Sequence, residues 1–200
     1  MTACFAEHGW AVGVDVDRFA LAQARQQFPT IAFLQLADEQ TMFRDATFDI
    51  VVANQMYNCV ADQPALFAEI YRVLKSGGIC FFGGRNKYAP VERQYHLPFL
   101  SWLPLPLART YVRLVRHQEF IGSNYRSYQA LRHLTRQFHV HDYTLEVLRH
   151  PQRHGFHRLV RYSWLFKLLP LAWLRGLIPN YLWVLEKSGK PTAPSATDVQ

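Results

Sequence analysis

An acidic residue stands at the end of the first apolar run of the chain, where it could bind a pair of hydroxyl groups. Residues 10–14 are mostly apolar and lead directly into Asp15. In open α/β folds, a carboxylate at a strand end accepts hydrogen bonds from a ribose diol, because it offers two acceptor oxygens. Asp15 is therefore a candidate ribose ligand, and the alternative is that it is only a turn residue. Asp17 is predicted to cap the helix that follows.

The sulfur and imidazole side chains show no spacing typical of a metal site or a disulfide framework. Cys4, Cys59 and Cys80 stand far apart, and we expect free thiols that pack as small buried residues in a reducing compartment. Eight of the nine histidines follow residue 84. His139 and His141 are predicted to share one strand face, but without the clustered carboxylates of a metal centre. We therefore predict no metal.

The residues that carry chemistry must be positioned by a succession of short strands and helices. Apolar runs predict strands at residues 10–14, 31–36, 48–53 and 79–82. Capping patterns predict one helix from Asp17 to about residue 27, and a second from Asp62 to the glycines at 77 and 78. This alternation predicts a parallel sheet with helices packed on it, which would bind ligands at the carboxyl ends of its strands.

The second half of the chain is less regular. A helix is predicted at residues 127–138, and strands are predicted at 140–148 and 181–186. Residues 90–117 and 151–180 mix prolines, tryptophans, leucines and arginines without a clear period. Residues 188–200 are rich in serine, threonine, proline and alanine, and they are predicted to form a disordered tail.

Charge divides the chain into two parts. Residues 1–84 hold nine acidic and five basic residues, whereas residues 85–200 hold six acidic and seventeen basic ones. The basic part is expected to face an anionic molecule or a membrane surface. Its aromatic segments at 95–116 and 158–183 suit either a membrane interface or a helical cap over a substrate pocket, and both alternatives stay open. Because no nucleic-acid reader motif is present, no nucleic acid partner is expected.

The most specific motif runs from residue 48 to residue 84. Phe48 and Asp49 begin an apolar strand, and residues 69–78 read EIYRVLKSGG. This segment resembles the pattern FD-apolar-apolar, a loop, and then E-apolar-x-RVLKPGG, with Ser76 in place of the usual proline. Together with GVD at residues 13–15, it resembles the type 11 branch of the class I S-adenosylmethionine-dependent methyltransferases. The resemblance covers residues 5–84 well and the final strand loosely.

The resemblance implies an α/β fold of the Rossmann-like kind, with a mostly parallel sheet, helices on both faces and an antiparallel last strand. It implies S-adenosyl-L-methionine as the cofactor. Asp15 would hold the ribose, Asn54 would line the methionine end, and Asp38, one position after the family's usual acid, would serve the adenine region. No catalytic residue is assigned, although His96 or His117 would be the general base for a hydroxyl acceptor.

The family's glycine-rich cofactor loop has no counterpart in this sequence. In the family, the first strand ends in a loop resembling D-x-G-x-G-x-G, whose glycines let the backbone approach the cofactor. Here nine residues precede Trp10, and they carry no such pattern. We therefore expect the first strand and its loop to be missing, so that its two neighbours lose their ladder partners. The expected cause is a fragment or a start codon chosen too late.

We predict one methyltransferase domain over residues 1–187, with a cofactor-binding half at 1–84 and an acceptor or cap region at 85–180. The predicted reaction is methyl transfer from S-adenosylmethionine to a small or lipid-like acceptor. The predicted location is the cytoplasm, with peripheral contact at the inner membrane face through the basic aromatic segments. No apolar stretch is long enough to predict a helix that spans a bilayer. The alternative is an inactive methyltransferase-like fragment, or a module that binds a membrane or a partner.

Overall fold

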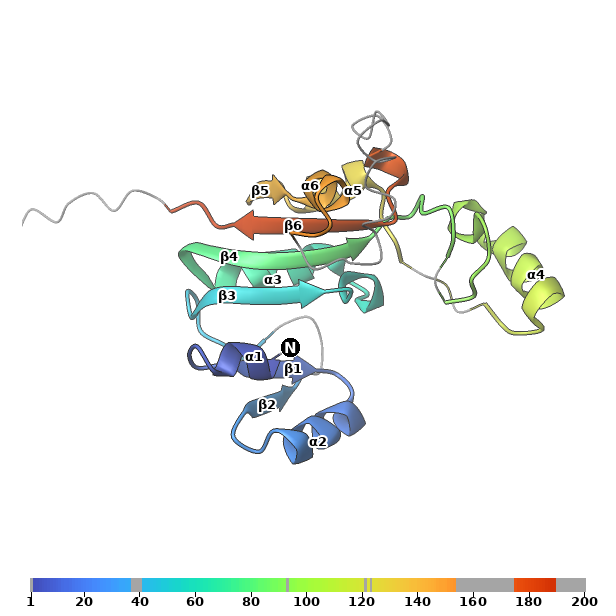
Figure 1. The fold of residues 1–200 in the computed structure, drawn as a ribbon. Helices are drawn as coiled ribbons and strands as arrows, with labels where there is room; N and C mark the ends of the chain where they lie inside the picture. The colour runs from blue at the N-terminus through green and yellow to red at the C-terminus, as the bar shows by residue number, and fades with distance from the viewer. Residues whose placement is uncertain are drawn as a thin grey trace, which may run out of the picture. The chain divides into compact units, whose positions relative to one another are not determined.

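The computed structural model describes residues 2–36, 41–92, 94–120, 122, 124–153 and 175–189. The chain forms two compact units, residues 1–43 and residues 44–200. Each unit has a sheet of its own, and each is described by itself. The two sheets are drawn as arrows in Figure 1.

The first unit is a strand–helix–strand arrangement preceded by a short helix. Its elements in chain order are α1 (Thr2–Ala6), β1 (Val12–Asp15), α2 (Arg18–Gln27) and β2 (Ala32–Gln35). β1 and β2 pair in parallel, so α2 is the crossover between them. Helix α2 begins where predicted, because the Asp17 carboxylate accepts a hydrogen bond of 2.8 Å from the backbone N–H of Phe19.

The second unit holds a four-stranded sheet in the order β3-β4-β6-β5. Its strands are β3 (Phe48–Asn54), β4 (Leu74–Arg85), β5 (His139–Asp142) and β6 (Asn180–Glu186). β3 and β4 are parallel, and β6 is antiparallel to both of its neighbours, which confirms the predicted antiparallel last strand. The helical elements are η1 (Tyr57–Cys59), α3 (Gln63–Val73), η2 (Leu100–Trp102), α4 (Leu105–Arg116), α5 (Tyr128–Leu134), α6 (Thr144–Arg149) and η4 (Arg175–Leu177).

The two strands that flank the family's first strand each have one partner. Among the strands that the structure describes, β1 pairs with β2 alone and β3 pairs with β4 alone. The expected absence of the family's first strand and its glycine loop stays a prediction. The chain therefore has a mixed α/β fold whose parallel pairs belong to separate units.

Helix α3 begins as predicted but ends four residues before the predicted glycines. The Asp62 carboxylate caps its first turn by accepting from the Ala65 N–H at 2.9 Å. At the other end the chain extends directly into β4 after Val73. The Lys187 ammonium donates to the carbonyls of Tyr71 and Leu74, at 2.7 Å each. The carbonyls of Arg72 and Val73 accept from the N–H groups of Ala46 and Thr47, so distant groups, rather than a glycine turn, satisfy this helix end.

The glycines predicted to end this helix have a different role in the structure. Gly77 does have a positive φ of 77°, but it lies inside the irregular first part of β4. Its N–H donates to the carbonyl of Lys187 at 2.8 Å. The Lys75 ammonium pairs with the Asp49 carboxylate at 2.7 Å. The glycines therefore shape the start of a strand.

Other predictions in the second half are corrected by the structure. The strand predicted at residues 140–148 is short, since β5 ends at Asp142 and α6 follows. The Asp142 carboxylate accepts from the Thr144 N–H at 3.0 Å, which turns the chain into that helix. Residues 105–116, where no regular element was expected, form α4. Of the tail predicted at residues 188–200, residues 190–200 lie outside the described residues.

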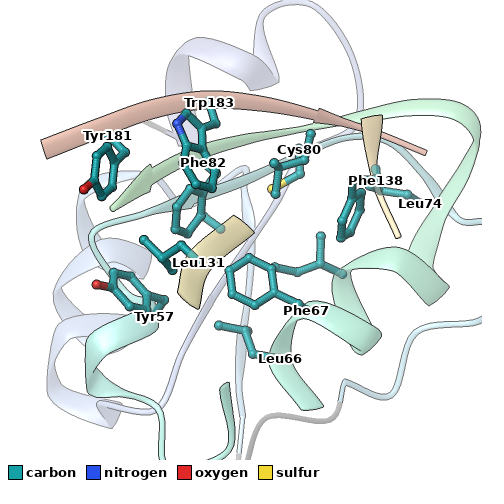
Figure 2. Packing of buried hydrophobic residues seen from close by; sticks show 13 residues of the cluster. Tyr57, Leu66, Phe67, Leu74, Cys80, Phe82, Leu131, Phe138, Tyr181 and Trp183 are labelled. Atoms are coloured by element: carbon teal, nitrogen blue, oxygen red, sulfur yellow. The ribbon is translucent and has the colours of Figure 1, made fainter. Parts of the chain in front are cut away.

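The main core lies between the four-stranded sheet and the helices α3 and α5 (Figure 2). Phe82 of β4 is fully buried at its centre. Its ring centroid lies 5.4 Å from that of Phe67, 5.7 Å from that of Tyr57 and 5.8 Å from that of Trp183. Aromatic side chains from β4, β6, α3 and η1 thus fix the sheet against its helices.

A smaller cluster of buried side chains packs under α4. Its members come from the loop after β4, from η2 and from α4 itself: Tyr95, Leu97, Leu100, Ala108 and Val112. The helix therefore has one buried face, carried by Ala108 and Val112, and its other side chains lie on the surface.

The cysteines only partly follow the expectation of burial. Cys80 is fully buried in β4, and burial raises the pKa of its thiol to about 12. Cys4 and Cys59 are exposed, which corrects the prediction for those two residues. In the part of the chain that the structure describes, no group of three or more metal-binding side chains is found. No described helix is long and apolar enough to cross a membrane.

Candidate functional site

A polar pocket opens at the carboxyl ends of β3 and β4. It is a shallow, largely open site of about 350 Å³, lined by Gln55, Asn58, Arg85, Gln94 and Tyr125. Parallel strands are expected to bind ligands at this end. The lining side chains come from the ends of the two strands, from η1, and from the segments after β4 and before α5. The pocket is therefore the candidate site of the second unit.

The end of β3 is shaped by a residue in the left-handed conformation. Gln55 has a φ of 59°, and its N–H donates to the carbonyl of Gly83 at 2.7 Å. This conformation turns the chain out of the sheet and into η1. Gln55 and Asn58 are thereby held at the mouth of the strand end, where both line the pocket.

Asn54, the predicted ligand of the cofactor's methionine end, is the last residue of β3. It is paired with Gly83 on β4, and its side chain lies across that glycine. A Cβ atom added at Gly83 would come within 2.1 Å of the Asn54 Oδ1 atom. Gly83 is therefore needed for the position of Asn54, which is exposed at the carboxyl end of the strand.

Buried tyrosine and glutamine side chains tie the pocket segments together. The hydroxyl of Tyr57 donates to the carbonyl of Arg85 and accepts from the Arg126 N–H at 3.0 Å. Burial is the main reason that the pKa of Tyr57 rises to about 12, so the phenol stays protonated. The Gln63 side chain donates to the carbonyls of Tyr57 and Asn124, at 3.1 and 2.7 Å. These bonds fix residues 124–126 beside the end of β4.

Arg85 supplies the positive charge of the pocket. Its Cζ atom lies 6.0 Å from the centroid of the Tyr125 ring, and its Nε atom is buried without a hydrogen-bond partner in the described part of the chain. The nearby Glu92 carboxylate is already engaged, since it accepts from the Tyr95 N–H at 2.8 Å and from the Tyr125 hydroxyl at 3.3 Å. The pocket therefore presents a cation and three amides.

The other predicted cofactor residues belong to the first unit. Asp15 is exposed at the end of β1, and one of its carboxylate oxygens accepts from the Asp17 N–H at 3.0 Å. This bond stabilises the turn after β1 and involves only one of the two carboxylate oxygens of Asp15. Asp38 lies outside the described residues. The roles of Asp15, Asp38 and Asn54 toward a cofactor stay predictions.

Three lining residues were not singled out by sequence reasoning. Arg85 is the last residue of β4, directly after a glycine pair, so the rule that ligands bind at carboxyl strand ends could have found it. Gln94 and Tyr125 carry no comparable signal, because they reach the pocket through tertiary contacts. The candidate bases His96 and His117 are exposed, and neither lines this pocket. Their catalytic role stays a prediction.

Comparison with known structures shows which class of fold this is. An S-adenosylmethionine-dependent methyltransferase from Mesorhizobium loti is 16% identical with a TM-score of 0.55, over 92% of this chain and 84% of that chain. The YcgJ protein of Bacillus subtilis is 15% identical with a TM-score of 0.53, over 94% and 86% of the two chains. A methyltransferase from Methanosarcina mazei is 14% identical with a TM-score of 0.53, over 90% and 82%. The chain thus has the Rossmann-like fold of these enzymes.

The first part of the chain also resembles one protein family in sequence. The family model of the methyltransferase domain matches residues 1–82, which include β1, β3, α3 and most of β4. A search of curated proteins gave no match. Residues 1–82 therefore resemble the class I S-adenosylmethionine-dependent methyltransferases, and S-adenosylmethionine is the cofactor that this resemblance implies.

Proposed function

We propose that the chain transfers a methyl group from S-adenosylmethionine to a small acceptor bound at the carboxyl ends of β3 and β4. The observation that carries this proposal is the polar pocket at that edge of the sheet, in a chain whose residues 1–82 match the methyltransferase domain. The sulfonium of the cofactor supplies an activated methyl group. The protein then has to hold the acceptor in line with the methyl carbon and exclude water.

The residues proposed to hold the cofactor can be tested for fit one by one. The exposed Asp15 carboxylate keeps one oxygen beyond its turn bond, which suits a ribose hydroxyl. The Asn54 amide is exposed beside Gly83. Because Gly83 has no side chain, the amide has room at that position. Residues 2–36 contain only Gly9 and Gly13, so they provide no glycine-rich loop. Taken one at a time, Asp15 and Asn54 each suit the cofactor group proposed for them.

Asp15→Asn is expected to weaken binding of S-adenosylhomocysteine at least about tenfold, because a carboxylate hydrogen bond is replaced by a neutral one. The asparagine can still accept from the Asp17 N–H, so the turn is kept. Isothermal calorimetry on the full chain measures the affinity. Glu7→Gln, which removes an exposed acid of the same unit, is the control and should bind like the wild type.

The outcomes separate the candidate functions. Equal affinity for the wild type and Asp15→Asn would mean that Asp15 is only a turn residue. No binding by the wild-type chain would favour the alternative of an inactive methyltransferase-like fragment or a binding module.

The surface of α4 supports the proposal of a lipid-like acceptor and of peripheral membrane contact. Leu107 and Leu114 lie on one face of the helix, seven residues apart, and are 57% and 71% exposed. Arg109 and Arg113 occupy another face, and the helix contains no acidic residue. Phe99, just before η2, is also half exposed. Exposed leucines flanked by arginines suit the boundary of an anionic bilayer, which agrees with the proposed cytoplasmic membrane face.

The paired change Leu107→Ser and Leu114→Ser is expected to lower binding to vesicles of phosphatidylcholine and phosphatidylserine at least about tenfold, because two leucines no longer leave water. Vesicle flotation of the full chain measures the bound fraction. The matched control is Leu34→Ser with Leu177→Ser, which changes two exposed leucines elsewhere. If the wild type does not float with anionic vesicles, α4 is better explained as a cap. Residues 154–174 lie outside the described residues and add nothing to this argument.

A further inference from the structure

The pocket at the ends of β3 and β4 contains an arginine whose charge is not matched. No carboxylate in the described part of the chain lies within salt-bridge distance of the Arg85 guanidinium. Its Nε atom is buried and has no hydrogen-bond partner there. Buried polar groups are almost always satisfied, so an exception calls for an explanation. A bound anion would satisfy both the charge and the N–H group.

The remaining lining favours an anion for the same reason. Gln55, Asn58 and Gln94 offer amide N–H donors, and no lining residue is acidic. The nearest acid with a known role, Glu92, is 3% exposed and accepts hydrogen bonds from Tyr95 and Tyr125. Its charge is therefore used to hold the segments around the pocket. The Asn58 amide also donates to the Cys59 Sγ atom at 3.5 Å, which leaves its second N–H group for a ligand.

The side chains and the size of the site indicate which class of anion it would bind. A guanidinium presents parallel N–H groups that match the two oxygens of a carboxylate. The Tyr125 ring, whose centroid is 6.0 Å from the Arg85 Cζ atom, adds a flat apolar surface beside that fork. The volume of about 350 Å³ is at the small end for ligand pockets. These features suit a compact acid that carries a ring or a short chain.

We propose that Arg85 binds the carboxylate of the methyl acceptor, so that the acceptor is a small organic acid rather than a neutral molecule. That the bound acid is the methyl acceptor rests on the proposed function. That Arg85 binds an anion does not depend on it. The pocket opens at the edge where β3 ends at Asn54. An acid anchored on Arg85 would therefore be fixed at one end, which leaves its other end to be presented for methylation.

The test uses benzoate and benzamide, which have the same ring and differ in charge. Each is titrated into the full chain without cofactor, and the affinity is measured by isothermal calorimetry, which reads the wild type and the variants alike. Benzoate is expected to bind the wild type at least about tenfold more tightly than benzamide, and Arg85→Gln should remove that preference. Arg109→Gln, on the exposed surface of α4, is the control and should keep it.

A second variant covers the case in which Arg85→Gln does not fold. Gln94 is exposed, so Gln94→Glu should leave the fold intact while placing a carboxylate in the lining. It is expected to lower benzoate affinity at least about tenfold and to leave benzamide unchanged, through repulsion between like charges. Equal binding of benzoate and benzamide by the wild type would overturn the inference, as would a benzoate preference that survives both substitutions.

The two proposals fail in different ways. Binding of S-adenosylhomocysteine without any preference for benzoate would leave methyl transfer standing and overturn the carboxylate site. A preference for benzoate that depends on Arg85, without binding of S-adenosylhomocysteine, would support the anion site and count against the proposed function.

Discussion

Phe82→Ala is expected to lower the free energy of unfolding by about 3–5 kcal/mol, the range typical of a phenylalanine truncated in a core. Phe82 is fully buried in β4, and its ring meets those of Tyr57, Phe67 and Trp183. These partners come from different elements, so they cannot all move in to fill the space (Figure 2). Urea unfolding followed by tryptophan fluorescence measures the change.

Phe81→Ala is the matched control for that experiment. Phe81 is the neighbouring residue of the same strand and points to the opposite face, where it is 38% exposed. Its loss should cost only about 1 kcal/mol, because much of its surface stays in water. Similar losses for both variants would contradict the assignment of the core to the Phe82 face of the sheet.

Gln63→Leu is expected to lower the free energy of unfolding by about 2–4 kcal/mol, since it leaves several buried groups without partners. The Gln63 amide donates to the carbonyls of Tyr57 and Asn124 and accepts from the Arg126 Nε–H at 2.5 Å. The side chain is fully buried. Urea unfolding gives the stability change. A benzoate titration should also weaken, because the segment held by Gln63 carries Tyr125 of the pocket.

Gln137→Leu is the control for this substitution. Its amide makes one hydrogen bond, to the carbonyl of Phe67 at 2.8 Å, and the residue is exposed. We expect a change within about 1 kcal/mol, because water can replace a bond at the surface. If Gln63→Leu is as mild as this control, residues 124–126 are not held by the glutamine.

The elements of the first half of the chain could be predicted because their signals are local. Asp17 and Asp62 cap helices where the sequence places them, and both are followed by regular apolar periods. The strand at residues 48–53 is confirmed with one added residue, Asn54. In each case the residues that decide the structure lie within a few positions of one another, so no tertiary information is required.

The errors arise where distant residues decide the outcome. The end of α3 is set by Lys187, which no pattern near residues 73–78 reveals. The change from β5 to α6 depends on the turn at Asp142 and on Thr144, whose hydroxyl accepts from the Leu182 N–H at 3.0 Å. The pocket is a similar case, because Tyr125 is brought to Arg85 by hydrogen bonds through Tyr57 and Gln63. A motif read along the chain contains none of this information.

The strand order of the second unit has a consequence for the time course of folding. β6 lies between β4 and β5, although it comes last in the chain, and it pairs residues as distant as Ile79 and Glu186. Within this sheet β5 pairs only with β6, so it has no place to dock until β6 has been added. Such non-local pairing slows folding. During synthesis the edge of β4 that pairs with β6 therefore stays unpaired until residues 180–186 have been made. We expect a chaperone that shields β4 in this interval to raise the yield of folded protein.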